Sequence, residues 1–250
     1  MAESRHILGV RVDATTYGDA TRQILEWARA AESAYVCCAS VNNIMEAHDS
    51  PEFRDVMNGA DLVTSDGMPL VWVLRMLGVR EATRVYGPDL TPMVLAAAAD
   101  AGVPVGFYGG SAAVLAELVR RVGVRFPALR IAYAESPPYR PATREEDERT
   151  SGAIADSGAR ILFIGLNTPK QDRWMQAHRG RVPAVMVGVG AAFDFLAGSK
   201  PQAPRWMQRS GLEWTFRLAT EPRRLWRRYL RHNPRFALLA FSELLRTRFT

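Results

Sequence analysis

Short apolar runs alternate with longer amphipathic segments from about residue 34 onward. The runs that we interpret as strands are Tyr35–Ala39, Leu62–Thr64, Val103–Tyr108, Arg130–Tyr133, Ile161–Gly165 and Ala184–Val189. The segments that we interpret as helices are Asp89–Ala101, Ala112–Arg125, Glu145–Ser157 and Pro169–His178. This alternation is typical of βαβ units, in which crossover helices join parallel strands. The pattern therefore predicts an α/β protein with a doubly wound, mostly parallel sheet.

The two ends of the chain depart from this alternation. His6–Val12 is expected to add a strand or a hairpin before the sheet begins. Near the other end the composition changes at Ser199–Pro204, and tryptophans then interleave with arginines. Asn233 and Pro234 are expected to interrupt this helical segment before a final helix over Phe236–Leu245. We therefore predict a main domain over residues 1–200 and a basic, Trp-rich helical appendage over 201–250.

The charge of the chain is concentrated in that appendage. Residues 204–250 contain eleven arginines and three glutamates, a formal charge of +8, whereas the remainder has 21 basic and 23 acidic residues, a charge of −2. A near-neutral body with a basic tail favours an anionic surface as the partner of the tail. The interleaved tryptophans favour a membrane surface over nucleic acid, although a nucleic-acid binder is an alternative to be tested.

The cysteines and the hydropathy of the chain indicate where it works. Cys37 and Cys38 are adjacent within an apolar run, a spacing that suits neither a disulfide framework nor a metal cluster. The four histidines are scattered, so we expect no metal held by the protein. The chain shows no secretory leader and no apolar stretch of membrane-spanning length. We expect a cytoplasmic protein that at most lies on the inner face of the membrane.

A strand runs directly into a helix at residues 161–176, where ligands bind in α/β sheets. Pro169 suits the first helical turn, and the amides that follow it suit a phosphate or a sugar hydroxyl group, with Lys170 and Gln171 at the rim. An ordinary capped helix with a solvated lysine is the alternative.

A carboxylate and a guanidinium follow neighbouring turns of the predicted sheet. Asp66 ends a strand, where it can act as a general base on an attacking hydroxyl group, or simply form an Asp-Gly turn. Arg84 precedes a helix for which Asp89 is a plausible N-cap. Its planar fork suits a diphosphate, but a surface arginine is the alternative unless Arg84 shares a cleft with Asp66.

Other strand ends carry polar or glycine-rich turns. Ser40 and Asn42 offer hydrogen-bonding groups to a sugar, although helix capping explains them equally well. Gly109, Gly110 and Ser111 allow close approach of the backbone to a phosphate, a weaker signal than a full dinucleotide fingerprint. Asp194 lies in an apolar setting and requires a polar partner, such as a backbone N–H group or a nucleotide.

Taken together, these residues resemble the bacterial WecG/TagA/CpsF glycosyltransferase family. The motifs that carry the resemblance are Asn42, Ala60–Gly67, Arg84–Asp89, Phe107–Gly110, Gly165–Gln171, Gly188–Gly198, Ala203–Trp214 and Glu221–Leu230. The resemblance implies a Rossmann-like fold and the inverting transfer of a sugar from a UDP-sugar to a polyprenyl-diphosphate-linked sugar. It implies no cofactor, because the UDP-sugar is the donor substrate. Such enzymes assemble teichoic acids, common antigen, capsules or exopolysaccharides.

The resemblance also implies a role for each candidate residue. Asp66 would be the general base on the acceptor hydroxyl, Arg84 and Gln171 would hold diphosphate or sugar groups, and the Ser40–Asn42 turn would shape the acceptor pocket. The glycine turn of Gly109, Gly110 and Ser111, together with Asp194, would line the UDP side. Lys170 is a further candidate for substrate binding.

Two departures from the family pattern leave the donor sugar open. Ser40 stands where many members have Thr, and Asn167 replaces a usual Gly. N-acetylmannosamine, its uronic acid, glucose and glucuronic acid are all compatible with the resemblance.

The basic appendage fits an acceptor that cannot leave the bilayer. Its arginines would meet anionic headgroups while its apolar side chains enter the interface. We hypothesise that the appendage also closes over the site and brings an arginine to the leaving diphosphate. The candidates for these two roles are Arg224, Arg227, Arg228 and Arg231. A homo-oligomer that packs the apolar face of the appendage is compatible with the sequence, as is a nucleotide-dependent oxidoreductase of the same fold class.

Overall fold

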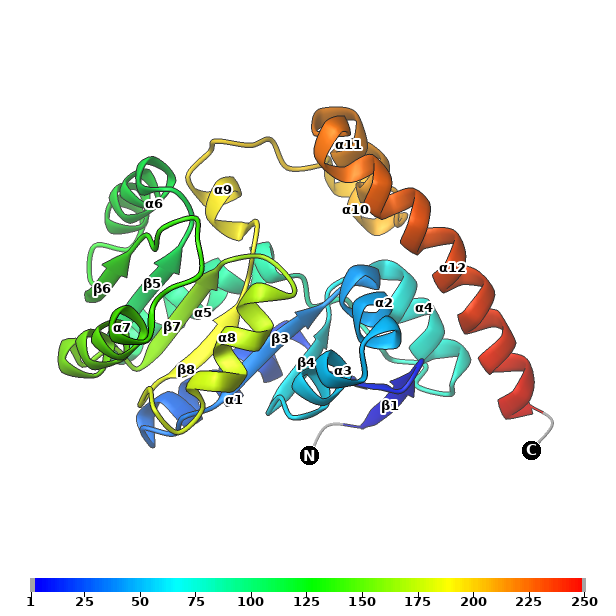
Figure 1. Ribbon diagram of the computed structural model, residues 1–250, viewed down its shortest axis with the longest axis horizontal. Helices are drawn as coiled ribbons and strands as arrows, with labels where there is room; N and C mark the ends of the chain where they lie inside the picture. The colour runs from blue at the N-terminus through cyan, green and yellow to red at the C-terminus, as the bar shows by residue number, and fades with distance from the viewer. Residues whose placement is uncertain (1–2, 249–250) are drawn as a thin grey trace.

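The centre of the molecule is a six-stranded sheet in which every neighbouring pair of strands is parallel (Figure 1). The computed structural model describes residues 3–248. The strand order is β4-β3-β8-β7-β5-β6. The strands are β3 (Tyr35–Ala39), β4 (Leu62–Ser65), β5 (Val105–Gly109), β6 (Ile131–Glu135), β7 (Ile161–Gly165) and β8 (Val185–Gly188). The predicted doubly wound α/β fold is therefore confirmed, with a sheet that is parallel throughout.

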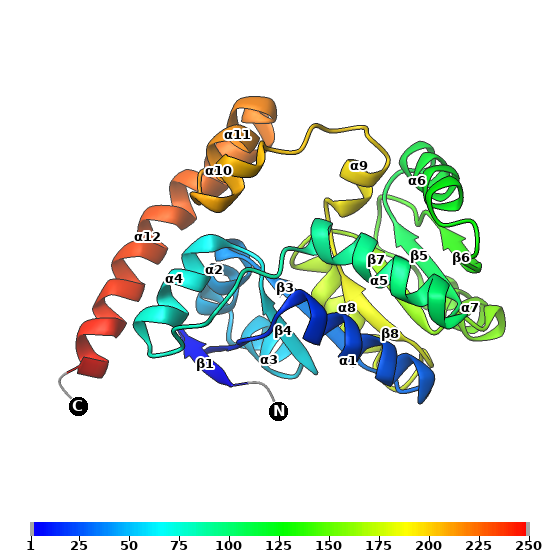
Figure 2. The same ribbon diagram turned by 180° about the vertical axis from the view of Figure 1, so that it is seen from behind.

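Helices cover both faces of this sheet, as the opposite views in Figures 1 and 2 show. One face packs against α1 (Tyr17–Arg29), α5 (Gly87–Ala101), α6 (Ala112–Arg125) and α9 (Ala192–Leu196). The other packs against α2 (Val41–Asp49), α3 (Pro51–Asn58), α4 (Met68–Met76), α7 (Arg144–Ser157) and α8 (Lys170–His178). Val36 and Cys38 of β3 enter the first core, and Tyr35 and Cys37 enter the second. Coverage of both faces explains why the strands read as uninterrupted apolar runs.

The expected extra element at the start of the chain is a hairpin. β1 (Ser4–Ile7) pairs antiparallel with β2 (Val10–Asp13) and forms a separate two-stranded sheet. Leu8 and Gly9 form the turn, and both have positive φ angles, of 49° and 82°. This combination is typical of the tight turns that join antiparallel strands.

The appendage consists of α10 (Arg205–Arg209), α11 (Glu213–Thr220) and α12 (Pro222–Arg248). The expected interruption at Asn233 and Pro234 is wrong, because α12 continues through both residues. A proline inside a helix removes a backbone hydrogen bond. Two turns of helix beyond that point are held by Phe236 and Ala240, which are buried in the core on the α2 and α4 side. Tertiary packing therefore overrides the local signal.

Two other helix starts differ slightly from expectation. α5 begins at Gly87 with Tyr86 as its N-cap, so Asp89 lies within the first turn and is not the cap. α8 begins at Lys170, which places Pro169 at the N-cap position. Among residues 3–248, no helix is both long enough and apolar enough to span a membrane.

The glycines at the end of β5 have a structural role between neighbouring strand ends. Gly109 has a φ of 125°, and a Cβ at this position would lie 2.7 Å from the backbone of Gly165 at the end of β7. The N–H of Gly110 donates a hydrogen bond to the carbonyl of Gly165 at 3.1 Å. The close approach that the sequence suggests is therefore made to a neighbouring strand.

Replacing Gly109 with alanine is expected to lower the free energy of unfolding by at least about 1–3 kcal/mol, because the φ angle and the contact with Gly165 both exclude a side chain. Gly123→Ala, in α6, is the matched control, since a Cβ there meets nothing within 4 Å. It should be neutral or stabilise the protein by up to about 1 kcal/mol. Chemical denaturation measures both, and equal effects would contradict this role for Gly109.

Candidate active site

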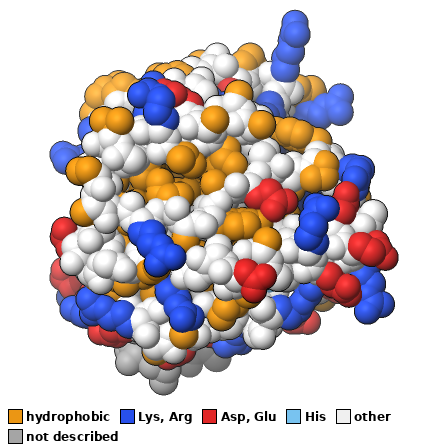
Figure 3. Space-filling view, turned by 90° about the vertical axis from the view of Figure 1, so that its left-hand side faces the viewer, with side chains coloured by type: hydrophobic (Ala, Val, Ile, Leu, Met, Phe, Trp, Pro, Cys, Tyr) orange, Lys and Arg blue, Asp and Glu red, His pale blue; other side chains and the backbone are white. Residues whose placement is uncertain are grey.

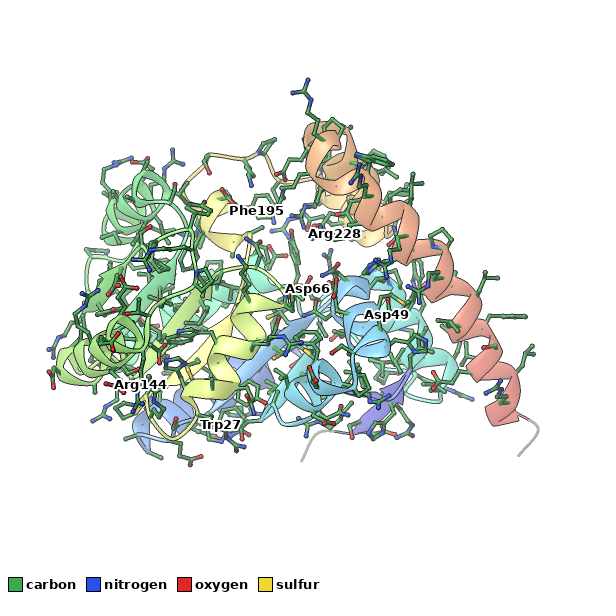
Figure 4. The ribbon with its side chains drawn as sticks, viewed as in Figure 1. Trp27, Asp49, Asp66, Arg144, Phe195 and Arg228 are labelled. Atoms are coloured by element: carbon green, nitrogen blue, oxygen red, sulfur yellow. The ribbon has the colours of Figure 1, made fainter. Side chains whose placement is uncertain are left out.

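A cavity of about 630 Å³ lies above the C-terminal ends of β3, β4, β7 and β8. α10, α11 and α12 close it from the opposite side, so the body and the appendage both contribute to its wall. Figure 4 shows Arg228 of α12 and Phe195 of α9 around the opening above Asp66. Parallel sheets bind ligands at this edge. The candidates Ser40, Asn42, Asp66, Arg84, Gln171 and Arg228 are on the wall.

Asp66 directly follows β4 and is held in place by the start of α5. Its Oδ1 accepts a hydrogen bond from the N–H of Gly87 at 2.6 Å. Burial raises the pKa of Asp66 to about 7, Arg84 and the Gly87 N–H oppose the increase, and Glu213 adds to it. The Asp66 carboxylate does not cap α4, the helix that follows the Asp-Gly turn, but accepts its hydrogen bond from the start of α5. A carboxyl group with this pKa suits proton transfer near neutral pH.

Arg84 shares the cavity with Asp66, the condition that distinguishes it from a surface arginine. Its Nε donates a hydrogen bond to the carbonyl oxygen of Asp66. Its Nη2 lies 2.5 Å from Oε2 of Glu213, and its guanidinium lies 4.0 Å from the centre of the Tyr86 ring. Only about 14% of the Arg84 side chain is exposed. The pairing with Glu213 fixes the guanidinium next to the Asp66 loop.

Glu213, the first residue of α11, was not among the candidate residues predicted from the sequence. Its Oε1 accepts a hydrogen bond from the Tyr86 hydroxyl at 2.7 Å while Oε2 binds Arg84. The side chain is 13% exposed. Glu213 lies within one of the matched motifs, but a motif does not show that it folds back 129 residues along the chain onto Arg84. This carboxylate joins the appendage to the edge of the sheet that carries Asp66.

The neighbouring asparagines after β3 differ in their partners, since Asn43 takes part in capping α2 and Asn42 does not. Asn43 accepts hydrogen bonds from the N–H and the hydroxyl of Ser40, at 3.1 and 2.8 Å, and donates to Thr168 at 2.9 Å. Asn42 faces the cavity, and within the described residues its buried Oδ1 has no hydrogen-bond partner. Asn42 is thus available to a hydroxyl or amide group of a ligand.

Gln171 is buried and holds the opposite part of the wall. Its Oε1 accepts a hydrogen bond from the N–H of Gly190 after β8, at 3.1 Å. Asn167 also lies on the wall and has a φ of 63°. This left-handed conformation favours glycine and tolerates asparagine, which explains the glycine usual at this position of the family pattern. Lys170 is exposed and lies off the wall.

The other UDP-side candidates also lie off this wall. Ser111 caps α6 by accepting a hydrogen bond from the N–H of Val114 at 3.3 Å, and Gly109 and Gly110 contact Gly165. The polar partner that Asp194 requires is Lys200, at 3.2 Å.

The arginines of the appendage occupy different positions. Arg228 lines the cavity, whereas Arg224 binds Glu221 at 2.7 Å and Arg231 lies 3.4 Å from Asp49 of the body. Arg227 is exposed and lies against the ring of its neighbour, Trp226.

A further arginine, Arg217 of α11, lines the cavity and was not among the predicted residues. The Nε atoms of Arg217 and Arg228 are buried without a hydrogen-bond partner in the part of the chain that the structure describes. Burial lowers the pKa of Arg228 from its usual value. Two guanidinium groups with buried, unpaired N–H donors suit an anionic ligand.

The cysteines and acidic residues show no metal-binding arrangement within residues 3–248. No group of three His, Cys, Asp or Glu side chains there could hold an ion. Cys37 and Cys38 are free, buried thiols.

A family model and a related protein both match most of this chain. The model of the glycosyl transferase WecG/TagA/CpsF family matches residues 5–250, which include every residue of the cavity wall. The chain is also 32% identical over 200 residues to a protein of Bacillus spizizenii named N-acetylglucosaminyldiphosphoundecaprenol N-acetyl-beta-D-mannosaminyltransferase. That alignment covers 80% of this chain and 76% of the relative.

The substitution Glu213→Gln is expected to lower the free energy of unfolding by about 1–3 kcal/mol, because the buried Arg84 loses its counter-charge. It should also lower the pKa of Asp66 below about 7, because a negative charge that raises it is removed. Chemical denaturation and carboxyl titration by NMR measure the two effects. Glu117→Gln, in an exposed pair with Arg120, is the matched control and should change neither. An unchanged Asp66 pKa in Glu213→Gln would contradict the coupling.

Proposed function

The chain belongs to the WecG/TagA/CpsF family of glycosyltransferases, and on that premise we propose that it transfers a sugar, with inversion, from a UDP-sugar to a polyprenyl-diphosphate-linked sugar. The name of the Bacillus spizizenii relative makes N-acetylmannosamine the first donor sugar to test and N-acetylglucosaminyl-diphospho-undecaprenol the first acceptor. The uronic acid of N-acetylmannosamine, glucose and glucuronic acid are the further donors to compare.

The observation that carries this proposal is the Asp66 carboxyl on the cavity wall with a pKa of about 7. In the proposed reaction the acceptor hydroxyl oxygen attacks the anomeric carbon, and Asp66 takes the hydroxyl proton. The bond from the anomeric carbon to the diphosphate oxygen breaks, and its electron pair leaves with UDP. Attack and departure on opposite faces of the sugar produce inversion. Holding both reactants in this geometry is a major part of the rate enhancement.

The departing diphosphate requires positive charge on the side opposite Asp66. Arg217 and Arg228 supply it in this proposal, since their buried Nε donors lack protein partners within residues 3–248. Preorganised donors in a water-poor cavity stabilise developing charge more strongly than donors in water.

The other candidates keep roles that follow from where they lie. Gln171 and Arg84 hold sugar or diphosphate groups, with Arg84 oriented by Glu213. Ser40 and Asn42 shape the acceptor pocket. The uridine side extends toward the ends of β7 and β5, where Lys170, Asp194 and Gly109–Ser111 lie.

We assign residues 201–250 to binding of an anionic membrane surface as well as to closure of the site. Trp206, Leu230, Leu238 and Phe241 of the appendage are between 62% and 73% exposed. Seen from the β6 end of the molecule, basic and acidic side chains are interspersed, and hydrophobic side chains gather in a hollow near the centre of the view (Figure 3). Each basic residue near an anionic leaflet contributes roughly 1 kcal/mol to binding.

UDP release from a panel of UDP-sugars, with and without a lipid-diphosphate-GlcNAc acceptor, tests the reaction. Acceptor-dependent release is expected with one preferred donor, and Asp66→Asn should reduce it by about 10²–10⁴-fold, because the base is lost while the shape is kept. Asp156→Asn, at an exposed carboxylate of α7 that lies off the wall, is the matched control and should retain far more activity than Asp66→Asn. Full activity of Asp66→Asn would remove Asp66 as the base.

The pH dependence follows from the raised pKa of Asp66. Only the ionised carboxylate accepts a proton, so kcat/KM should rise as the pH passes through about 7 and level off above it. Initial rates between pH 5 and 9, at an acceptor concentration well below KM, measure this limb. A rising limb near pH 4, the range of an ordinary aspartate, would show that burial does not control the base.

A further inference from the structure

The face of α12 that lines the cavity changes from charged to apolar along its length. Residues spaced four apart lie on one face of a helix. On this face the successive side chains are Arg228, His232, Phe236, Ala240 and Leu244, and all of them line the cavity. Arg228 and Leu244 are 16 residues apart, which corresponds to about 24 Å of helix. The polar end of this face is the end nearer Asp66.

The opposite wall shows the same change of polarity. α4 begins two residues after Asp66, and its side chains on the wall are Met68, Pro69, Trp72, Val73 and Met76. Figures 1 and 2 both show α4 and α12 side by side. Within the described residues, the charged side chains of the wall are Asp66, Arg84, Glu213, Arg217 and Arg228, and none lies on α4 or beyond Arg228 on α12. The two helices therefore enclose an apolar groove that opens from the catalytic site.

The groove has a buried floor and exposed walls, so a long chain can lie along it and also leave it. Phe236 and Ala240 are buried, at 5% and 4% exposure, and form its floor. Trp72, Met76 and Phe241 are 43%, 56% and 62% exposed and lie on its walls. A flat membrane surface is contacted by outward-facing side chains, whereas these residues line a cavity that is continuous with Asp66. The arrangement suits an amphiphile whose polar head reaches the catalytic residues.

We propose that the groove between α4 and α12 binds the first isoprenoid units of the lipid chain of the acceptor. The proposal rests on the proposed function and adds a site for a part of the substrate that undergoes no reaction. With the chain in the groove, the diphosphate of the acceptor lies at the polar end of this face, near His232, and its sugar is directed toward Asp66. The rest of the chain leaves the groove toward the membrane. Binding energy from the lipid then contributes to the orientation of the reacting hydroxyl group.

Acceptors that carry GlcNAc-diphosphate on alkyl chains of increasing length test the groove, in solution without detergent or vesicles and below the concentration of micelle formation. For the wild type, KM should fall by up to about fourfold for each added methylene group that enters the groove, and level off once the groove is filled. Ala237→Trp places a large side chain at an exposed position on the groove wall. It should raise the KM of long-chain acceptors toward that of the shortest one.

Leu238→Trp is the matched control, because Leu238 is the next residue of α12, is 73% exposed and is not on the wall. It should keep the full dependence on chain length. A wild-type KM that is independent of chain length, with turnover of every acceptor, would overturn the groove and leave the proposed function intact. Equal loss of the dependence on chain length in the two variants would indicate a general apolar surface and overturn the groove as well. So would a dependence of KM on chain length that arises only after vesicles are added. No turnover of any acceptor by the wild type would overturn both proposals.

Discussion

The ion pair between Glu213 and Arg84 is the contact on which the organisation of the site depends. It joins the first turn of α11 to the loop that carries Asp66, because Arg84 also donates a hydrogen bond to the carbonyl of Asp66. The Tyr86 hydroxyl donates a second hydrogen bond to the Glu213 carboxylate. A buried arginine without a counter-charge is strongly destabilising. The pair therefore holds the appendage against the sheet edge. Arg84 is thus paired, whereas the Nε atoms of two other arginines of the cavity, Arg217 and Arg228, have no protein partner in the described chain.

The raised pKa of Asp66 follows from this enclosure. A carboxylate at the end of a strand is ordinarily solvated, whereas here the surrounding protein removes water and raises its pKa to about 7. The N–H of Gly87 and the charge of Arg84 prevent a larger increase. Burial and two opposing stabilising contacts together place the titration of the carboxyl group near neutral pH, where a general base is most effective.

The appendage combines a face that lines the cavity with apolar side chains that are exposed. One face of α12 completes the cavity, and other side chains of the appendage, such as Trp206 and Leu230, are exposed. The tail also contacts the body through residues that do not line the cavity, Arg235 with Asp49 and Glu243 with the N–H of Leu8. These contacts hold α12 against the body along most of its length, which gives the groove beside α4 a defined shape.

The local pattern of apolar and polar residues was sufficient to predict much of the fold and several candidate residues of the site. Uninterrupted apolar runs such as Ile161–Gly165 identified the strands, because a parallel sheet covered on both faces buries every side chain of a strand. Parallel strands bring their carboxyl ends to one edge, so Asp66, Asn42 and Gln171 were recognisable as candidates from their positions alone. The local signal failed at Pro234, where burial of Phe236 and Ala240 maintains a helix that the residue sequence disfavours.

The sequence by itself determined the elements of the fold and the family, because both depend on residues close together in the chain. Only the tertiary structure decided which polar groups meet. Glu213 reaches Arg84 across 129 residues, Asp194 pairs with Lys200, and the glycines at the end of β5 contact β7. The same holds for the groove, since the apolar faces of α4 and α12 look like ordinary core faces until the fold leaves a cavity between them. Distances between remote side chains, and the exclusion of water that shifts their pKa values, arise only when the chain has folded.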